Sequence, residues 1–110
     1  TFSNTVIGQT IRKTIGFAGA LMSDDLSMGA LDGTLASRAT RALAAGCDLV
    51  LHCNGKAAEM AEIAPVVPRL DGAPTERVAR ALAATGPPAE PVEPDALAAA
   101  LGALLDPEEA

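Results

Sequence analysis

The chain contains no tryptophan and no tyrosine, and aromatic residues make up only 2% of it. It therefore lacks the aromatic stacking platform of a free-standing sugar-binding module. No apolar run approaches the roughly 20 residues that cross a bilayer, and the opening segment TFSNTVIGQTIRK lacks the basic-then-apolar order of a secretory signal. We expect no membrane span and no membrane partner.

An excess of basic charge is also missing. The net charge is −6, from 8 basic and 14 acidic residues, which disfavours binding to a nucleic-acid backbone or an anionic lipid surface. Acidic and basic residues balance up to residue 85, so the body of the chain is neutral. The acidic excess comes from six later residues, Glu90, Glu93, Asp95, Asp106, Glu108 and Glu109. We interpret this region as a solvated, alanine-rich acidic helix and tail.

Cysteine and histidine are scarce. Cys47 and Cys53 lie six residues apart on one expected strand, which places their α-carbons about 20 Å apart, too far for a disulfide. With His52 as the single histidine, they do not form a recognisable metal site, and we expect no metal and no cofactor. Free thiols without a signal peptide favour a reducing, cytoplasmic location.

Hydrophobic periodicity predicts alternating helices and short buried strands. Ile7, Ile11 and Ile15 recur every four residues after the capping candidates Ser3 and Asn4. The segments FAGALMS and CDLVLHC are short and mostly apolar, as in strands covered on both faces. The expected elements are helices over 4–15, 35–43, 56–63, 74–86 and 95–105, with strands over 17–23 and 47–53.

A helical crossover between the two strands predicts that they run parallel. Two parallel strands leave open edges and need cover on both faces, so they do not form a self-sufficient sheet. The chain also begins at Thr1 rather than Met, and we expect it to be a piece of a longer polypeptide. The fold class is therefore α/β, the C-terminal part of a (β/α)₈ barrel with two further helices, and the alternative is an open doubly wound sheet. We divide the chain into a barrel portion over 1–70, a helix packing on the barrel over 71–86, and the acidic helix and tail over 87–110.

Asp24 and Asp25 directly follow the first expected strand. Reactive groups of parallel sheets and barrels collect beyond the carboxyl ends of the strands. Consecutive side chains of an extended backbone point to opposite faces, so only one of the two acids can face a pocket. The alternative role is capping of a short helical turn over 26–30. Spacing alone favours neither role.

Other polar residues are weaker candidates. Asp48 lies at the start of its strand, at the wrong end for a site. We interpret His52 as a core residue hydrogen-bonded to the backbone rather than a proton-transfer group. Lys56 fits a solvated helix start, and Met22 and Met28 are expected to pack.

The stretches IRKTIGFAGALMSDDLSMGAL and RATRALAAGCDLVLHCNG closely resemble the last third of the catalytic barrel in β-N-acetylhexosaminidases of glycoside hydrolase family 3, the bacterial peptidoglycan-recycling type. The resemblance covers roughly Thr1 to Leu70. It implies that residues 23–28 follow the seventh barrel strand and that residues 47–53 form the eighth. Asp24 then matches the catalytic nucleophile.

The resemblance implies retaining hydrolysis of terminal N-acetylglucosamine from peptidoglycan fragments or related β-glycosides, without a cofactor. The acid/base histidine, its aspartate and the sugar-binding residues belong to earlier strands, so an upstream barrel segment is the implied partner, and His52 is not that histidine. We expect the isolated chain to be inactive. The alternative function is a small receiver-like or interaction module that binds Mg²⁺ in an acidic pocket at Asp24 and Asp25.

Overall fold

The computed structural model describes residues 2–86 and 93–105. Its elements alternate between helices and two short strands, as expected. In chain order they are the π-helix η1 (Thr5–Thr14), β1 (Met22–Asp25), α1 (Leu35–Ala45), β2 (Leu49–Leu51), α2 (Ala57–Ile63), the 3₁₀ turn η2 (Ala64–Val66), α3 (Ala73–Ala83) and α4 (Pro94–Leu105).

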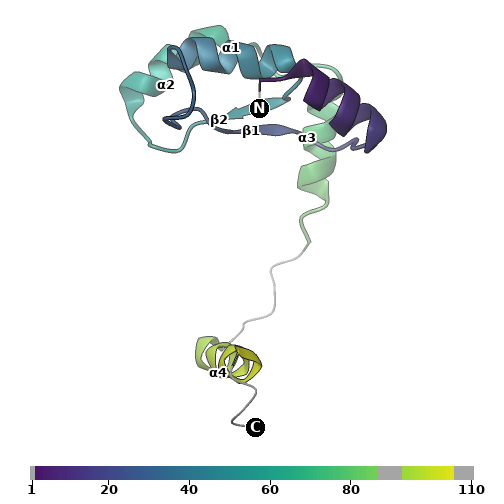
Figure 1. The fold of residues 1–110 in the computed structure, drawn as a ribbon, viewed down its shortest axis with the longest axis vertical. Coiled ribbons are helices and arrows are strands. Elements are labelled where there is room, and N and C mark those ends of the chain that lie inside the picture. The colour runs from purple at the N-terminus through teal and green to yellow at the C-terminus, as the bar shows by residue number, and fades with distance from the viewer. Residues whose placement is uncertain (1, 87–92, 106–110) are drawn as a thin grey trace.

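The two strands pair in parallel, which confirms the predicted crossover. Met22 pairs with Leu49 and Asp25 with Leu51, with an irregularity in register between the two pairs. Helix α1 connects the strands and lies with η1 and α2 on one side of them (Figure 1). The β1–α1–β2 segment is thus one βαβ unit, consistent with part of a barrel domain.

Both strands are shorter than predicted. Residues 17–21 are not a strand. The carbonyl groups of residues 17–19 bond to arginine side chains instead: Arg12 donates to Phe17 and Gly19, at 2.9 and 2.7 Å, and Arg80 donates to Ala18 at 3.0 Å. Phe17 is 42% exposed rather than buried. The second strand covers only residues 49–51 of the expected 47–53.

The core lies between the strands and the helices on their covered side. One cluster contains Ile7, Ala42, Ala45 and Cys47, and the other contains Leu26, Ala39 and Ile63. Val50 packs against both clusters. Because α1 contributes only alanines to these clusters, its backbone approaches the sheet closely. No helix within residues 2–86 covers the other face of the sheet, so this chain provides cover on one face only.

The structure confirms most of the predicted helix start and stop signals. Ser3 caps η1 by accepting a hydrogen bond from the Val6 N–H at 3.2 Å, whereas the side chain of Asn4 makes no cap. The last turn of η1 bonds five residues back, from Ile15 N–H to the Thr10 carbonyl at 2.8 Å. Ile15 itself is exposed, so the predicted apolar stripe is buried only in part. Gly46 ends α1 in the left-handed conformation, as predicted.

Helices α3 and α4 contain no buried residue. In α4 the large apolar side chains are exposed, namely Leu97, Leu101, Leu104 and Leu105. Within residues 2–86 and 93–105, no helix has the length and apolar character needed to cross a bilayer. The predicted tail over 87–110 lies outside the described residues at 87–92 and 106–110.

Candidate active site

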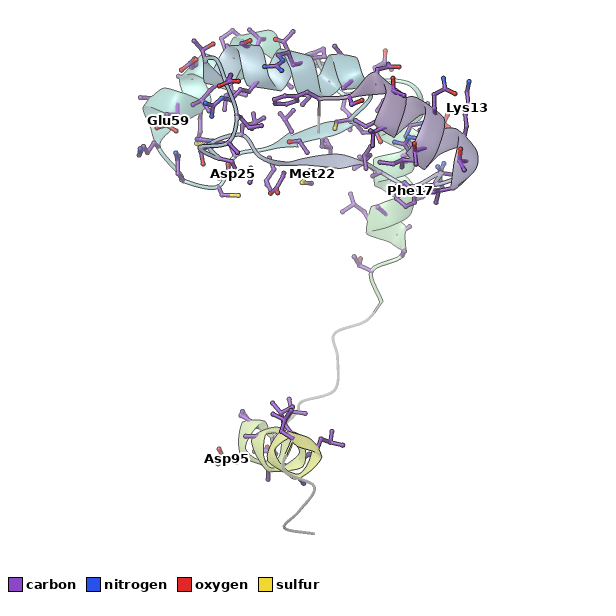
Figure 2. The ribbon with its side chains drawn as sticks, in the orientation of Figure 1. Lys13, Phe17, Met22, Asp25, Glu59 and Asp95 are labelled. Carbon is purple, nitrogen blue, oxygen red and sulfur yellow. The ribbon has the colours of Figure 1, made fainter. Side chains whose placement is uncertain are left out.

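The carboxyl end of β1 presents three polar residues in alternation. Ser23 is buried on the helix side of the strand, Asp24 is exposed on the opposite side, and Asp25 is again partly buried. Met22, two residues before Asp24, is likewise 48% exposed on the side without helices (Figure 2). The period of two along a strand therefore separates the paired acids onto opposite faces.

Asp25 performs the capping role that the sequence left open for the pair. Its carboxylate accepts hydrogen bonds from the backbone N–H of Ser27 at 3.1 Å and of Cys53 at 3.2 Å, and from the Ser27 hydroxyl. These bonds, those from Ser27 foremost, lower the pKa of Asp25. Asp25 thus joins the ends of both strands to the turn that follows β1.

Asp24 is left with an exposed carboxylate at the end of the strand. Its Oδ1 accepts a hydrogen bond from the Asp25 N–H at 2.8 Å, which orients the group. Sequence reasoning overlooked Ser23, which supports this arrangement from behind. The Ser23 hydroxyl donates to the Asp24 carbonyl at 2.8 Å and accepts from the Leu51 N–H at 3.1 Å, across the irregularity in strand register.

The loop after β1 is organised by Arg38 on α1. Its guanidinium donates to the carbonyl of Leu26 at 2.8 Å and to that of Leu31, and approaches the carbonyl of Met28 at 3.3 Å. An arginine one helical turn into α1 thereby fixes the whole loop that follows the candidate nucleophile. Sequence reasoning missed this role, since an arginine on an amphipathic helix reads as a solvated charge. Met28 is exposed, so the expectation that it packs is wrong, as it is for Met22.

His52 is buried, as predicted, with its side chain 8% exposed. The expected hydrogen bond to the backbone is absent, because neither ring nitrogen has a hydrogen-bond partner among the described residues. Instead the ring lies between two carboxylates. Nδ1 is 3.8 Å from Asp25 Oδ1, too far for a hydrogen bond, and Nε2 is 3.2 Å from Glu59 Oε2 without making one.

Glu59 on α2 belongs to the same corner of the molecule. It accepts hydrogen bonds from the Asn54 amide and from the Lys56 ammonium at 3.0 Å, and these lower its pKa. Lys56 is otherwise exposed, in line with a solvated helix start. Sequence reasoning did not single out Glu59, because a glutamate in the first turn of a helix is common.

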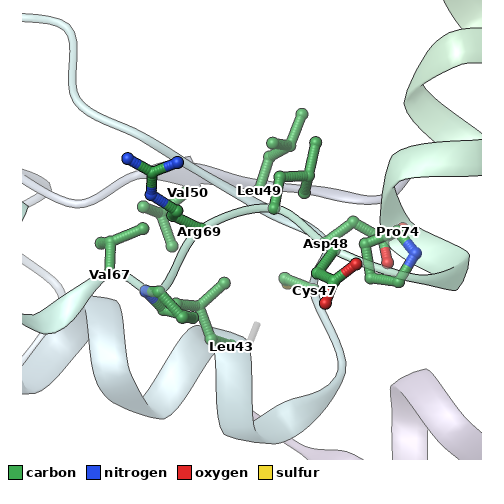
Figure 3. A pocket seen from close by; sticks show the side chains of 11 residues that line it. Leu43, Cys47, Asp48, Leu49, Val50, Val67, Arg69 and Pro74 are labelled. Carbon is green, nitrogen blue, oxygen red and sulfur yellow. The ribbon is translucent and has the colours of Figure 1, made fainter.

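At the amino ends of the strands, a cluster of ion pairs around Asp48 has a structural role. The Asp48 side chain is 2% exposed and binds Arg12 at 2.8 Å, Arg77 at 3.0 Å and the Leu21 N–H at 2.9 Å. Burial raises the pKa of Asp48, but the hydrogen bonds from Arg77 and Leu21 outweigh it, so the net pKa is lowered. Asp48 also lines a cavity of about 360 Å³ with Leu43, Leu49 and Pro74 (Figure 3). It does not serve the site at the carboxyl ends.

The thiols and acids form no metal centre in the described part of the chain, where no group of three or more His, Cys, Asp or Glu residues is placed to hold an ion. Cys47 and Cys53 are both free, the first buried and the second exposed. Burial raises the pKa of the Cys47 thiol. The receiver-like alternative thus gains no support from the geometry of Asp24 and Asp25, which point apart.

Comparison with known proteins gives a consistent assignment. The family model described as Glycosyl hydrolase family 3 N terminal domain matches residues 1–84. A beta-hexosaminidase of Idiomarina loihiensis is 36% identical over 83 residues, covering 74% of this chain and 25% of the relative. Beta-hexosaminidases of Alkalilimnicola ehrlichii and Nitrosospira multiformis are 50% and 47% identical over 56 and 62 residues. Those matches cover 49% and 54% of this chain and 16% and 18% of the relatives.

The chain therefore spans between 16% and 25% of the length of these three relatives. All three relatives are beta-hexosaminidases. The family match includes β1, β2 and the loop between Asp24 and Arg38. The chain belongs to glycosyl hydrolase family 3, through part of its N-terminal domain.

Proposed function

We propose that the chain is the nucleophile-bearing portion of a retaining β-N-acetylhexosaminidase, placed at the last two strands of a (β/α)₈ barrel. The substrate class is a glycan with a terminal non-reducing N-acetylglucosamine, from peptidoglycan fragments or related β-glycosides. The observation that carries the proposal is the exposed carboxylate of Asp24, held at the carboxyl end of a parallel strand on the face that no helix of the described chain covers.

The two faces of the βαβ unit support this placement. In a barrel, helices cover the outer face of each strand, while the inner face points to the axis. Helices η1, α1 and α2 pack on the face to which Ser23 and Val50 point. The face that carries Met22 and Asp24 then corresponds to the interior of the barrel, above which the substrate sits at the carboxyl ends of the strands.

Asp24 would attack the anomeric carbon and form a glycosyl ester while the bond to the leaving oxygen breaks. Water then cleaves the ester and restores the carboxylate. The proton for the leaving group and the base for the water come from a second group outside this chain. Asp25 is excluded from that part because its carboxylate points to the opposite face and is occupied by Ser27 and Cys53.

The remaining details of the proposal follow the family and the names of the relatives. Each of the three relatives is a beta-hexosaminidase, and a terminal N-acetylhexosamine is the sugar that such an enzyme releases. We place the protein in the cytoplasm on the strength of its free thiols. The upstream βα units of the barrel are its required partner.

The test uses the full-length gene product and the release of 4-nitrophenol from its β-N-acetylglucosaminide. Asp24→Ala is expected to lower kcat by about 10⁴-fold or more, because no carboxylate remains to form the ester. Azide then restores turnover and yields a glycosyl azide, in which the new C–N bond replaces the bond to nitrophenolate. Asp32→Asn is the control, since Asp32 is exposed in the loop away from the strand ends.

Full activity in Asp24→Ala would exclude the nucleophile assignment. A loss that azide does not rescue would assign Asp24 a structural role instead. The isolated 110-residue chain is expected to release no nitrophenol, because it lacks the acid/base group and the sugar-binding residues. Turnover by that chain, abolished in its Asp24→Asn variant, would contradict this part of the proposal.

A further inference from the structure

The corner formed by Asp25, His52 and Glu59 has a feature that the proposed hydrolysis does not use. Three elements meet there: the end of β1, the residue after β2, and the first turn of α2. The imidazole side chain is only 8% exposed, and neither of its nitrogens has a hydrogen-bond partner among the described residues. Buried polar atoms are almost always paired, so an unpaired ring between two carboxylates requires an explanation.

The protonation state of the ring decides whether the two contacts attract. A neutral imidazole has one N–H donor and one bare nitrogen with a lone pair, which repels a facing carboxylate oxygen. An imidazolium has two donors. The ring nitrogens lie 3.8 Å from Asp25 and 3.2 Å from Glu59, so each donor of the protonated ring faces one acid, and the contact with Asp25 must shorten to become a hydrogen bond.

We propose that protonated His52 is a positioning residue, an imidazolium that bridges Asp25 and Glu59 and so clasps the carboxyl ends of β1 and β2 to α2. Asp25 is the neighbour of Asp24 and donates its N–H to the Asp24 carboxylate at 2.8 Å. Holding Asp25 in place on the helix side of β1 therefore also fixes the direction of the Asp24 carboxylate on the opposite side. Only this consequence for catalysis rests on the proposed function; the clasp itself does not.

Other charges near the corner do not replace this role. Lys56 bonds to Glu59 from the solvent side, at 3.0 Å, and is 68% exposed. Arg38 and Glu62 line the adjacent hollow with Glu59, Lys56 and Asn54, but Arg38 is committed to the loop carbonyls and Glu62 to the Ala36 N–H at 3.2 Å. Asp24 lies on the other face of β1. The two acids that face the imidazole remain Asp25 and Glu59.

The first experiment observes the imidazole directly in the full-length gene product, where the His52 ring ¹⁵N signals are identified by their loss in His52→Gln. With the bridge in place, both ring nitrogens carry protons. Glu59→Gln removes the charged acceptor and is expected to speed the exchange of the Nε2 proton with water by about tenfold or more. Glu62→Gln, with the same charge change one turn along α2, is expected to change that exchange by less than about twofold.

The second experiment uses the full-length gene product. His52→Gln, which donates to only one of the two acids, is expected to lower kcat about tenfold with KM within about twofold. Glu59→Gln keeps the ring and provides the milder variant if His52→Gln folds poorly.

Several results would overturn the clasp. These are a ring that carries a proton on one nitrogen only, an unchanged exchange of the Nε2 proton in Glu59→Gln, or an unchanged kcat in His52→Gln. Each of them leaves the nucleophile test at Asp24 unaffected. Conversely, if Asp24→Ala retains activity, the proposed function fails while the ring spectra still decide the clasp.

Discussion

At the scale of single residues, the two ends of the strands divide function from stability. Acids at the carboxyl end are exposed or held by backbone N–H groups, whereas Asp48 at the amino end is buried against two arginines. Arg12 lies on η1 and Arg77 lies on α3. Asp48 therefore links two helices to the start of β2. The charges at this end therefore serve the fold, as expected at the amino-terminal face of a barrel.

Substituting Asp48 is expected to destabilise the chain. Asp48→Asn keeps the size of the side chain but removes the charge that two guanidinium groups face, and we expect the free energy of unfolding to fall by about 2 to 3 kcal/mol. Both arginines are partly exposed, which keeps the loss below that of a fully buried pair. Urea unfolding of the full-length gene product, followed by circular dichroism, measures it. Asp32→Asn is the matched control, with an expected change within about 0.5 kcal/mol.

The same carboxylate predicts the response to acid. The pKa of Asp48 is lower in the folded chain than in the unfolded chain, so the unfolded state binds the proton more readily. The stabilisation is fully present above the unfolded value of about 3.9 and is lost as the pH falls through the lower folded value. Asp25 and Glu59 act in the same direction.

Urea midpoints at pH 7, 5, 4 and 3 test this expectation. The wild-type urea midpoint is expected to be nearly constant from pH 7 to about pH 5 and to decrease at lower pH. In Asp48→Asn the midpoint is expected to decrease less steeply with falling pH. A midpoint that rises on acidification, or an equal slope in the variant, would contradict it.

At the scale of elements, α1 determines how closely the sheet is covered. Its inward face is made of alanines, and it ends at Gly46, whose backbone has a φ of 112°. A Cβ at this position would lie 2.9 Å from Cγ2 of the buried Ile7 on η1. The glycine is thus required both by the turn and by the approach of η1.

Gly46→Ala is therefore expected to lower the free energy of unfolding by about 2 kcal/mol, from the left-handed backbone and the contact with Ile7 together. Thermal unfolding measures it. The control is Gly29→Ala in the loop after β1, where no atom lies within 4 Å of the added Cβ and the expected change is within about 0.5 kcal/mol. Equal midpoints for the two variants would show that Ile7 or the turn adapts.

The element boundaries show what the sequence can predict and what it cannot. Helix ends carry local chemical signals, such as Ser3 and Gly46, and these were read correctly. Strand length depends on neighbours: residues 17–21 have the composition of a strand, but the carbonyls of residues 17–19 bond to Arg12 and Arg80 instead. The separation of Asp24 from Asp25 followed from strand alternation alone. The contacts of His52 with Glu59 did not, because they join residues from different elements.

At the scale of the whole molecule, the α/β body has one face covered by helices and one without. Met22 is exposed on the second face, and the apolar Leu49 is its strand partner. A two-stranded parallel sheet with one uncovered apolar face is not found by itself in stable domains. The large apolar side chains of α4 are exposed as well. The chain accordingly presents two distinct apolar surfaces.

These surfaces predict that the isolated chain binds an environment-sensitive dye such as anilinonaphthalene sulfonate at pH 7, and that it aggregates at high concentration. A chain ending at Gly86 separates the two surfaces, because it removes α4 and keeps the sheet face. We expect it to retain at least about half of the dye fluorescence, and Met22→Lys in that shorter chain to reduce the remainder.

The full-length gene product provides the decisive comparison. Upstream barrel strands would cover the edges of the two-stranded sheet and enclose the face that carries Met22. With both proteins ended at Gly86 to remove α4, dye fluorescence per chain should therefore be several-fold lower in the longer gene product. Equal fluorescence from the full-length protein, or complete loss on removal of α4, would mean that the strand face is not the surface completed by the rest of the barrel. The position assigned to Asp24 inside that barrel would then have to be abandoned with it.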